Sequence, residues 1–193
     1  MTSEIRSATN TTPVVTLRPL TMGDRDCVRR WMADPAVINF TVLVPGPEYG
    51  PVEPYDAEAA DRYLECLVRD PDRRSFAIEV DQRHVGNVGL RNYDPNNPVA
   101  ECFIEIGEGP LRRRGVGRAA MVQLLELAFG IYGVQRVRLG VFEFNVAAIR
   151  LYRSLGFDDD GEYGSHYVEG RYFRVIAMAV DRQGFIARCS VRR

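Results

Sequence analysis

Lysine is absent from this sequence of 193 residues, so its 25 lysine-plus-arginine positions are all arginines. Without lysine the chain cannot form a Schiff base, use a catalytic side-chain amine or build a lysine-dependent phosphate loop. An arginine bias in codon usage explains the total more simply than a functional role does. The positions at which arginines cluster are therefore more informative than their number.

Cysteine and histidine are also scarce. Four cysteines lie far apart without a CxxC pair, and only two histidines occur. Disulfide frameworks and zinc sites need closer and more regular spacing. We therefore expect free thiols in a reducing cytoplasm and no bound metal.

Long apolar runs and an excess of one charge are missing as well. No stretch approaches the roughly 20 apolar residues of a membrane span. Residues 1–12 contain seven Ser, Thr or Asn, which is unlike a signal peptide. The 25 cations nearly cancel 26 anions, for a formal net charge of −1. This balance argues against a nucleic-acid partner, and the sequence predicts no membrane partner either.

The chain is long enough, and at 46% hydrophobic residues apolar enough, to bury one core without disulfides or metals. We find no internal repeat. We expect a disordered tail over residues 1–12, a single domain over 13–181 and a C-terminal tail over 182–193.

Hydrophobic spacing predicts a mixed α/β fold. Thr21 and Asp24 match a capping box before a first helix that ends near Asp34, and the prolines and glycines of 41–56 exclude regular structure there. Two strands form a hairpin, and at least one βαβ crossover follows. The expected strands cover about 14–18, 75–81, 84–91, 100–107, 137–141 and 172–180; later helices cover about 57–69, 116–131 and 146–155.

One motif lies at a predicted strand–turn–helix junction. Gly115 and Gly117 stand beside four arginines, Arg112, Arg113, Arg114 and Arg118. Glycine lets backbone N–H groups approach a ligand, and a helix N-terminus favours an anion. The segment therefore predicts a pyrophosphate cradle, although an ordinary tight turn with solvated arginines would look the same.

A second motif lies one crossover downstream. Asn145 stands at an expected helix N-cap, and Gly156 stands at the C′ position of the same helix. Tyr152 falls between them at helical spacing. The pattern by itself fits a well-capped helix with a core tyrosine better than it fits a functional tyrosine.

Together the two motifs resemble the acetyl-CoA-binding core of the GNAT N-acetyltransferase superfamily. In that family an (Arg/Gln)-x-x-Gly-x-(Gly/Ala) loop, here residues 112–117, holds the CoA pyrophosphate. An Asn…Ala…Leu-Tyr…Gly-Phe helix follows the next strand, here over 145–157. The resemblance spans Leu17 to Met178 and looks like the branch resembling ribosomal-protein N-acetyltransferases. It implies an α/β fold with a mixed, mostly antiparallel twisted sheet, a central splayed parallel strand pair and flanking helices.

The resemblance also implies residue roles. Tyr152 would protonate the departing CoA thiolate, and Asn145 would bond the CoA arm while capping its helix. A phenol that stays protonated at neutral pH suits the first role. The implied cosubstrate-binding residues are Ile104, Glu105, Ile106, Arg112, Arg113, Arg114, Gly115, Val116, Gly117, Arg118, Asn145 and Tyr152.

The general base is less directly indicated. Glu101 and Glu105 share one strand face, and either carboxylate could accept the proton of an ammonium group. We choose Glu105 because it is closer to the loop, with a surface glutamate as the alternative interpretation. His166 is a third candidate.

The acceptor is expected to border residues 45–55 and 161–170, where Glu48, Tyr49, Glu53 and Tyr55 would suit a cationic amine. Arg174 stands where the branch often has an acid, which argues against a ribosomal-protein substrate. We predict direct transfer in a ternary complex from acetyl-CoA to a primary amine of a small molecule, such as an amino sugar, polyamine, amino acid or antibiotic. The alternatives are a protein N-terminal amine as acceptor, or a non-catalytic acyl-CoA sensor. The oligomeric state stays open, with a homodimer as one option.

Overall fold

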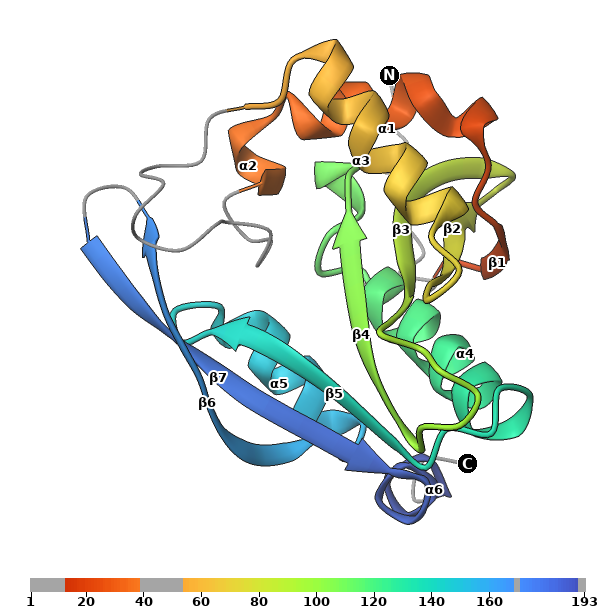
Figure 1. Cartoon of the computed structure of the whole chain (residues 1–193), viewed down its shortest axis with the longest axis vertical. Helices are drawn as coiled ribbons and strands as arrows, with labels where there is room; N and C mark the ends of the chain where they lie inside the picture. The colour runs from red at the N-terminus through yellow and green to blue at the C-terminus, as the bar shows by residue number, and fades with distance from the viewer. Residues whose placement is uncertain (1–12, 39–53, 169–170, 191–193) are drawn as a thin grey trace, which may run out of the picture.

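The structure is a computed structural model that describes residues 13–38, 54–168 and 171–190. Its centre is a seven-stranded sheet in the order β1-β2-β3-β4-β5-β7-β6 (Figure 1). The strands are β1 (Val15–Pro19), β2 (Arg74–Val80), β3 (Arg83–Arg91), β4 (Val99–Ile106), β5 (Arg136–Phe142), β6 (Asp158–Val168) and β7 (Arg171–Asp181). The α-helices are α1 (Arg25–Met32), α2 (Pro35–Ile38), α3 (Ala57–Arg69), α4 (Val116–Gly130), α5 (Val146–Ser154) and α6 (Arg182–Ser190).

The central strands β4 and β5 are parallel, but they pair only at their beginnings. The register joins Val99 to Arg136 and Glu101 to Arg138, and no pairing continues beyond that point. Strand β5 instead pairs with β7 along its whole length. The two strands therefore diverge, as Figure 1 shows for β4 in light green and β5 in cyan. All other strand pairs are antiparallel, which confirms the predicted fold class.

Helices cover both faces of the sheet with separate cores. The larger core joins α4 and α5 to one face, and its centre includes Leu124 and Leu155. The smaller core joins α1, α2 and α3 to the other face through Trp31, Leu64 and Ala77. Figure 1 shows α3 and α4 on opposite sides of β3 and β4. Strand β4 therefore lies between two layers of helices, each packed on the sheet through its own hydrophobic core.

The predicted helix ends are present. The backbone N–H of Thr21 donates to the Asp24 carboxylate at 2.9 Å. Asn145 caps α5 by accepting from the Ala148 N–H at 3.2 Å. Gly156 follows α5 with φ +94°, a conformation that other residues adopt at a cost. A Cβ there would also lie 2.6 Å from the carbonyl oxygen of Gly184, so this glycine lets α6 pack closely.

Three of these helices and strands were not predicted from the sequence: the short helix α2, strand β6 and helix α6. Strand β6 carries irregular pairing and two positive-φ glycines, Gly161 and Gly164, which remove the period-2 pattern. Residues 182–190 of the expected tail form α6. Its Phe185 is buried and lies 5.8 Å from the ring of Phe129, so a tertiary contact holds this helix.

Candidate active site

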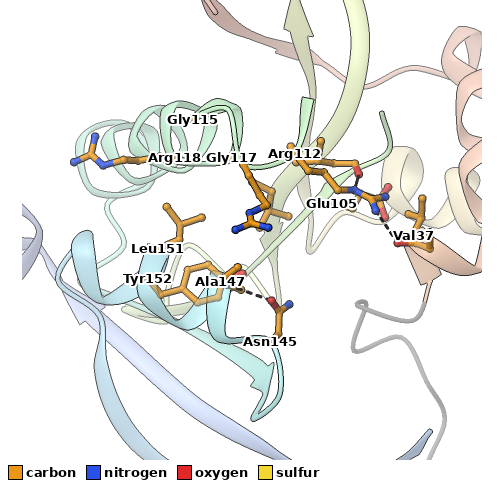
Figure 2. A pocket seen from close by; sticks show the side chains of 15 residues that line it. Val37, Glu105, Arg112, Gly115, Gly117, Arg118, Asn145, Ala147, Leu151 and Tyr152 are labelled. Carbon is orange, nitrogen blue, oxygen red and sulfur yellow. Dashed lines mark hydrogen bonds between the residues drawn. The ribbon is translucent and has the colours of Figure 1, made fainter. Parts of the chain in front are cut away.

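A pocket of about 470 Å³ opens between β4, the N-terminus of α4, and α5 (Figure 2). It lies beside the divergence of β4 and β5, where the sheet no longer closes. Its lining residues are Ala36, Val37, Ile104, Glu105, Ile106, Arg112, Arg113, Gly115, Gly117, Arg118, Asn145, Ala147, Ala148, Leu151 and Tyr152. The fold thus brings both sequence motifs to one cavity.

The loop before α4 is shaped for an anion. Gly115 is the N-cap of α4 with φ +86°, and Arg113 has φ +62°. Within the described part of the chain no side chain caps this helix, and its first turn holds no acidic residue. The first N–H groups of a helix have no partner within it, so those of residues 116–118 are available to a ligand. Backbone in this conformation forms anion-binding concavities.

The four arginines of the motif have different positions. Arg112 donates from Nε to the Ile106 carbonyl at 2.9 Å and from a terminal nitrogen to the Ala36 carbonyl at 2.8 Å. Arg112 therefore ties α2 to the end of β4. Arg113 and Arg118 line the pocket, and the Nε of Arg118 is buried without a hydrogen-bond partner among the residues that the structure describes. Arg114 is exposed and does not line the pocket.

Two further residues of the predicted loop differ in role. Val116 is fully buried in the larger core, so its side chain anchors the helix start. Gly117 lines the pocket, and a Cβ there would make only ordinary contacts, 3.7 Å from Leu151 and 3.8 Å from Ile104. The fold therefore does not require glycine at this position. A longer side chain would fill the pocket instead.

Helix α5 contributes Asn145 and Tyr152. Figure 2 shows the side-chain oxygen of Asn145 accepting a hydrogen bond from the first turn of α5, with the amide nitrogen pointing away from that bond. Tyr152 is 8% exposed, and burial raises the pKa of its hydroxyl. The phenol therefore keeps its proton at neutral pH and can act as a proton donor.

Glu105 reaches the pocket from β4. Its side chain is 6% exposed and accepts hydrogen bonds from Asn87 at 2.5 Å and from Tyr63 at 3.1 Å. Burial raises the pKa of this carboxyl to about 7, although both hydrogen bonds oppose the rise. No cation pairs with it in the described part of the chain. It can therefore bind and release a proton near neutral pH.

Glu101 lies four residues before Glu105 on the same strand face but is differently placed. Its carboxylate pairs with Arg91 at 2.9 Å and accepts a hydrogen bond from the Tyr163 hydroxyl at 2.5 Å. Glu101 does not line the pocket, so it is poorly placed to accept a proton from a molecule bound there. The tertiary structure thus separates two glutamates that strand periodicity treats alike.

Several residues at or behind the site were not found by sequence reasoning. Ala36 and Val37 line the pocket from the short helix α2. Tyr63 and Asn87 hold Glu105 from α3 and β3. The sequence offered one signal for Asn87: a polar residue within an otherwise apolar strand. In the structure Asn87 is fully buried and hydrogen-bonded to Glu105.

Other predicted positions contribute less or lie outside the described residues. Glu48, Tyr49 and Glu53 fall within the segment 39–53, which the structure does not describe, and the side chain of His166 is likewise outside it. Arg174 is exposed and pairs with Glu143 at 3.4 Å.

The described residues contain no group of three or more His, Cys, Asp or Glu that could hold a metal ion. None of the helices described is long and apolar enough to cross a membrane.

Comparison with known proteins identifies the family. Residues 15–158 match the family model described as an acetyltransferase (GNAT) domain. The chain belongs to the GNAT acetyltransferases. It is therefore an acyltransferase of the class that uses acetyl-CoA, as the two motifs indicated.

Individual relatives of this GNAT chain cover most of its length. Spermidine N(1)-acetyltransferase of Escherichia coli is 27% identical over 176 residues, which cover 90% of this chain and 89% of the relative. The L-amino acid N-acetyltransferase AaaT of Escherichia coli is 26% identical, with 86% and 96% covered. Spermidine N-acetyltransferase of Vibrio cholerae, solved with CoA and spermine, superposes with a TM-score of 0.76 at 23% identity over 89% of this chain and 98% of that one.

Proposed function

We propose that this chain transfers the acetyl group of acetyl-CoA to a primary amine of a small molecule, by direct transfer in a ternary complex. The observation that carries the proposal is the lining of the pocket. One cavity joins an uncapped helix N-terminus, a carboxyl that titrates near pH 7 and a phenol that stays protonated.

The residues around the pocket fit acetyl-CoA. The N–H groups at the start of α4 would hold the pyrophosphate, together with Arg113 and the unpartnered Nε of Arg118. The main chain of β4 lacks a paired strand toward β5 beyond Glu101, so its polar groups there, apart from the Ile106 carbonyl that accepts from Arg112, are available to the pantetheine arm. When bound, acetyl-CoA supplies the acetyl group as a thioester, which an amine attacks.

Two side chains would handle the protons of the reaction. Glu105 takes a proton from the ammonium form of the acceptor, because an amine attacks only with a free electron pair. Tyr152 holds a proton on its hydroxyl oxygen and gives it to the departing sulfur. Asn145 keeps α5 and hence Tyr152 in place while its amide nitrogen remains available to the CoA arm.

Direct transfer is favoured because no described cysteine is suited to carry the acetyl group. Cys102 is buried in the core near Tyr152, and burial raises the pKa of its thiol to about 12. The thiol therefore stays protonated and is a poor nucleophile. Cys27 is half-buried and Cys66 is exposed, and neither lines the pocket.

A small-molecule acceptor is supported by the relatives, whose names specify spermidine and L-amino acids as substrates. Tyr55 and Tyr63 add aromatic rings, 6.2 Å apart, near Glu105. Aromatic faces and a buried carboxylate suit an ammonium group.

The proposal is tested by measuring free-thiol release from acetyl-CoA across a panel of polyamines, amino acids, amino sugars, aminoglycosides and N-terminal peptides. We expect turnover with at least one small amine and none above background with peptides. Turnover with peptides alone would replace the small-molecule acceptor by a protein N-terminus. Stabilisation by acetyl-CoA in a thermal-shift assay without turnover on any amine would instead support a sensor.

A further inference from the structure

A row of polar side chains runs behind Glu105, away from the pocket. It passes from Glu105 through Asn87 and His84 to Asp24 and Arg18, near the outer strand β1. Asn87 is fully buried, and the side chains of His84 and Asp24 are 5% and 7% exposed. Burying this many polar groups is unfavourable unless each has a partner, so the row needs an explanation.

The hydrogen-bond directions along this row follow from one contact. The Nε2 of His84 lies 3.0 Å from the Gly86 carbonyl oxygen and 2.8 Å from Oδ1 of Asn87. A carbonyl oxygen only accepts, so Nε2 carries a hydrogen in both the neutral and the charged form of the ring. Asn87 must therefore present its oxygen to His84 and its Nδ2 hydrogens to Glu105.

The opposite orientation of the Asn87 amide is unfavourable at the His84 end, and also at the Glu105 end whenever that carboxyl is ionised. After a flip, Nδ2 would face the hydrogen on Nε2 of His84, and Oδ1 would face the carboxylate of Glu105. A donor would then face a donor at the His84 end, and an acceptor would face an acceptor at the Glu105 end, in a buried site. His84 thus acts on Glu105 through Asn87 without touching it.

The ring of His84 is itself held in place. It packs edge-on against Trp31 with 4.7 Å between the ring centroids. Its Nδ1 lies 3.3 Å from Oδ1 of Asp24 and makes no hydrogen bond within the described part of the chain, so this contact is attractive only in the charged form of the ring. Arg18 donates to both oxygens of Asp24, at 2.9 and 2.6 Å. Burial lowers the pKa of His84, while burial of Asp24 is more than offset by its hydrogen bonds, which bring its pKa to about 2.

We propose that Asn87 and His84 are positioning residues for Glu105. They direct an N–H onto Oε1 at 2.5 Å, so that Oε2, which accepts only the longer hydrogen bond from the Tyr63 hydroxyl at 3.1 Å, is the oxygen that accepts the proton. In that step an N–H bond of the acceptor ammonium breaks, an O–H bond forms at Oε2, and the electron pair stays on nitrogen. The catalytic use of this proton rests on the proposed function, whereas the positioning itself does not.

The groups that face Glu105 are few, which makes the proposal testable by titration. Asn87 approaches from β3, Tyr63 from α3, and Tyr55 lies near enough for the charge of Glu105 to raise its pKa beyond the effect of burial. The tyrosines stay protonated at neutral pH because burial raises the pKa of both. Loss of the Asn87 donor therefore has one expected effect: it destabilises the charged carboxylate and raises the pKa of Glu105.

The experiment titrates the Glu105 carboxyl by infrared difference spectroscopy, with Glu105→Gln identifying its band, and needs no turnover. Asn87→Leu and His84→Phe are each expected to raise the midpoint by about one pH unit or more, since a hydrogen bond to a charged group is removed or misdirected. His84→Gln restores an N–H near the position of Nε2 and is expected to return the midpoint toward that of the parent.

The same variants are then compared in the pH profile of kcat/KM, where the acidic limb should move to higher pH by the same amount. A parent-like midpoint in folded His84→Phe would overturn the positioning role, and so would His84→Gln behaving as His84→Phe does. If Asn87→Leu fails to fold, the comparison of His84→Phe with His84→Gln still tests the positioning role. Shifted midpoints in a protein with no turnover on any amine would uphold the positioning and reject the proposed function.

Discussion

Glu105 and Tyr152 line one pocket, Glu105 from strand β4 and Tyr152 from helix α5. Burial moves the pKa of both groups upward, for Glu105 to about 7. The consequence differs, because the carboxyl then exchanges a proton near neutral pH while the phenol retains one. A proton acceptor and a proton donor in one cavity are what acyl transfer to an amine requires.

Replacing Tyr152 by Phe removes the proposed proton donor and little else. We expect kcat to fall by roughly 10²- to 10⁴-fold with little change in acetyl-CoA affinity, as for loss of a general acid. Steady-state kinetics and calorimetric binding measure the two effects. Tyr93→Phe is the matched control, because the Tyr93 hydroxyl bonds the Tyr132 carbonyl outside the pocket. Unchanged turnover in Tyr152→Phe would remove this residue from the acid role.

Replacing Glu105 by Gln removes the proposed base while leaving the side-chain shape. We expect kcat/KM to fall by about 10²-fold or more near neutral pH, and the limb near pH 7 to disappear from its pH profile. Glu101→Gln is the control on the same strand face. It should lose less activity and keep the limb, because Glu101 does not line the pocket and its side chain is engaged by Arg91 and Tyr163. If the limb near pH 7 persists in Glu105→Gln, then a group other than Glu105 titrates there.

Glu105 also makes stability depend on pH. Its pKa is raised from 4.5 to about 7 in the folded protein, so the folded state binds the proton more tightly. Stability therefore falls as pH rises between these values. Glu105→Gln lacks this penalty, and its free energy of unfolding relative to the parent should increase between pH 4.5 and 7, by up to roughly 3 kcal/mol. Urea unfolding at pH 5 and 8 measures the difference, and equal values at both would contradict it.

Gly117 tests the pocket without disturbing the fold. Gly117→Leu should fold with the stability of the parent or slightly more, because leucine favours helix and the Cβ has room. Its side chain would enter the pocket, so acetyl-CoA affinity should fall at least tenfold. Gly130→Leu, at the other end of α4 and with no atom within 4 Å of its Cβ, should bind normally. Calorimetry compares the two, and equal affinity would move the cosubstrate site away from Gly117.

Asn145 separates capping from binding. Asn145→Ala should cost about 1 kcal/mol of stability through loss of the cap and should also weaken acetyl-CoA binding. Asp56 caps α3 in the same way, accepting from the Ala59 N–H at 2.7 Å. Asp56→Ala should therefore lose similar stability with unchanged affinity. If both variants bind acetyl-CoA equally well, Asn145 is a cap alone.

Local features of the site were predictable because they depend on neighbours in the chain. The N-cap at Asn145 and the positive φ of Gly156 follow from residues within four positions of each. The same holds for the glycine that begins α4. Regular periodicity likewise predicted α3 over its full range, whereas the irregular β6 and the helix α6 have no such pattern.

The environment of each side chain was decided only by the tertiary structure. In sequence, Glu101 and Glu105 are equivalent members of one strand face. Folding places Glu101 between Arg91 and Tyr163, and it buries Glu105 against Asn87 and Tyr63 without a cation. The sequence by itself determined where a strand, a turn, the glycine-led helix α4 and the capped helix α5 form, because those depend on local backbone preference. Protonation depends on burial and on charges brought together from distant segments, and only the packed chain supplies them.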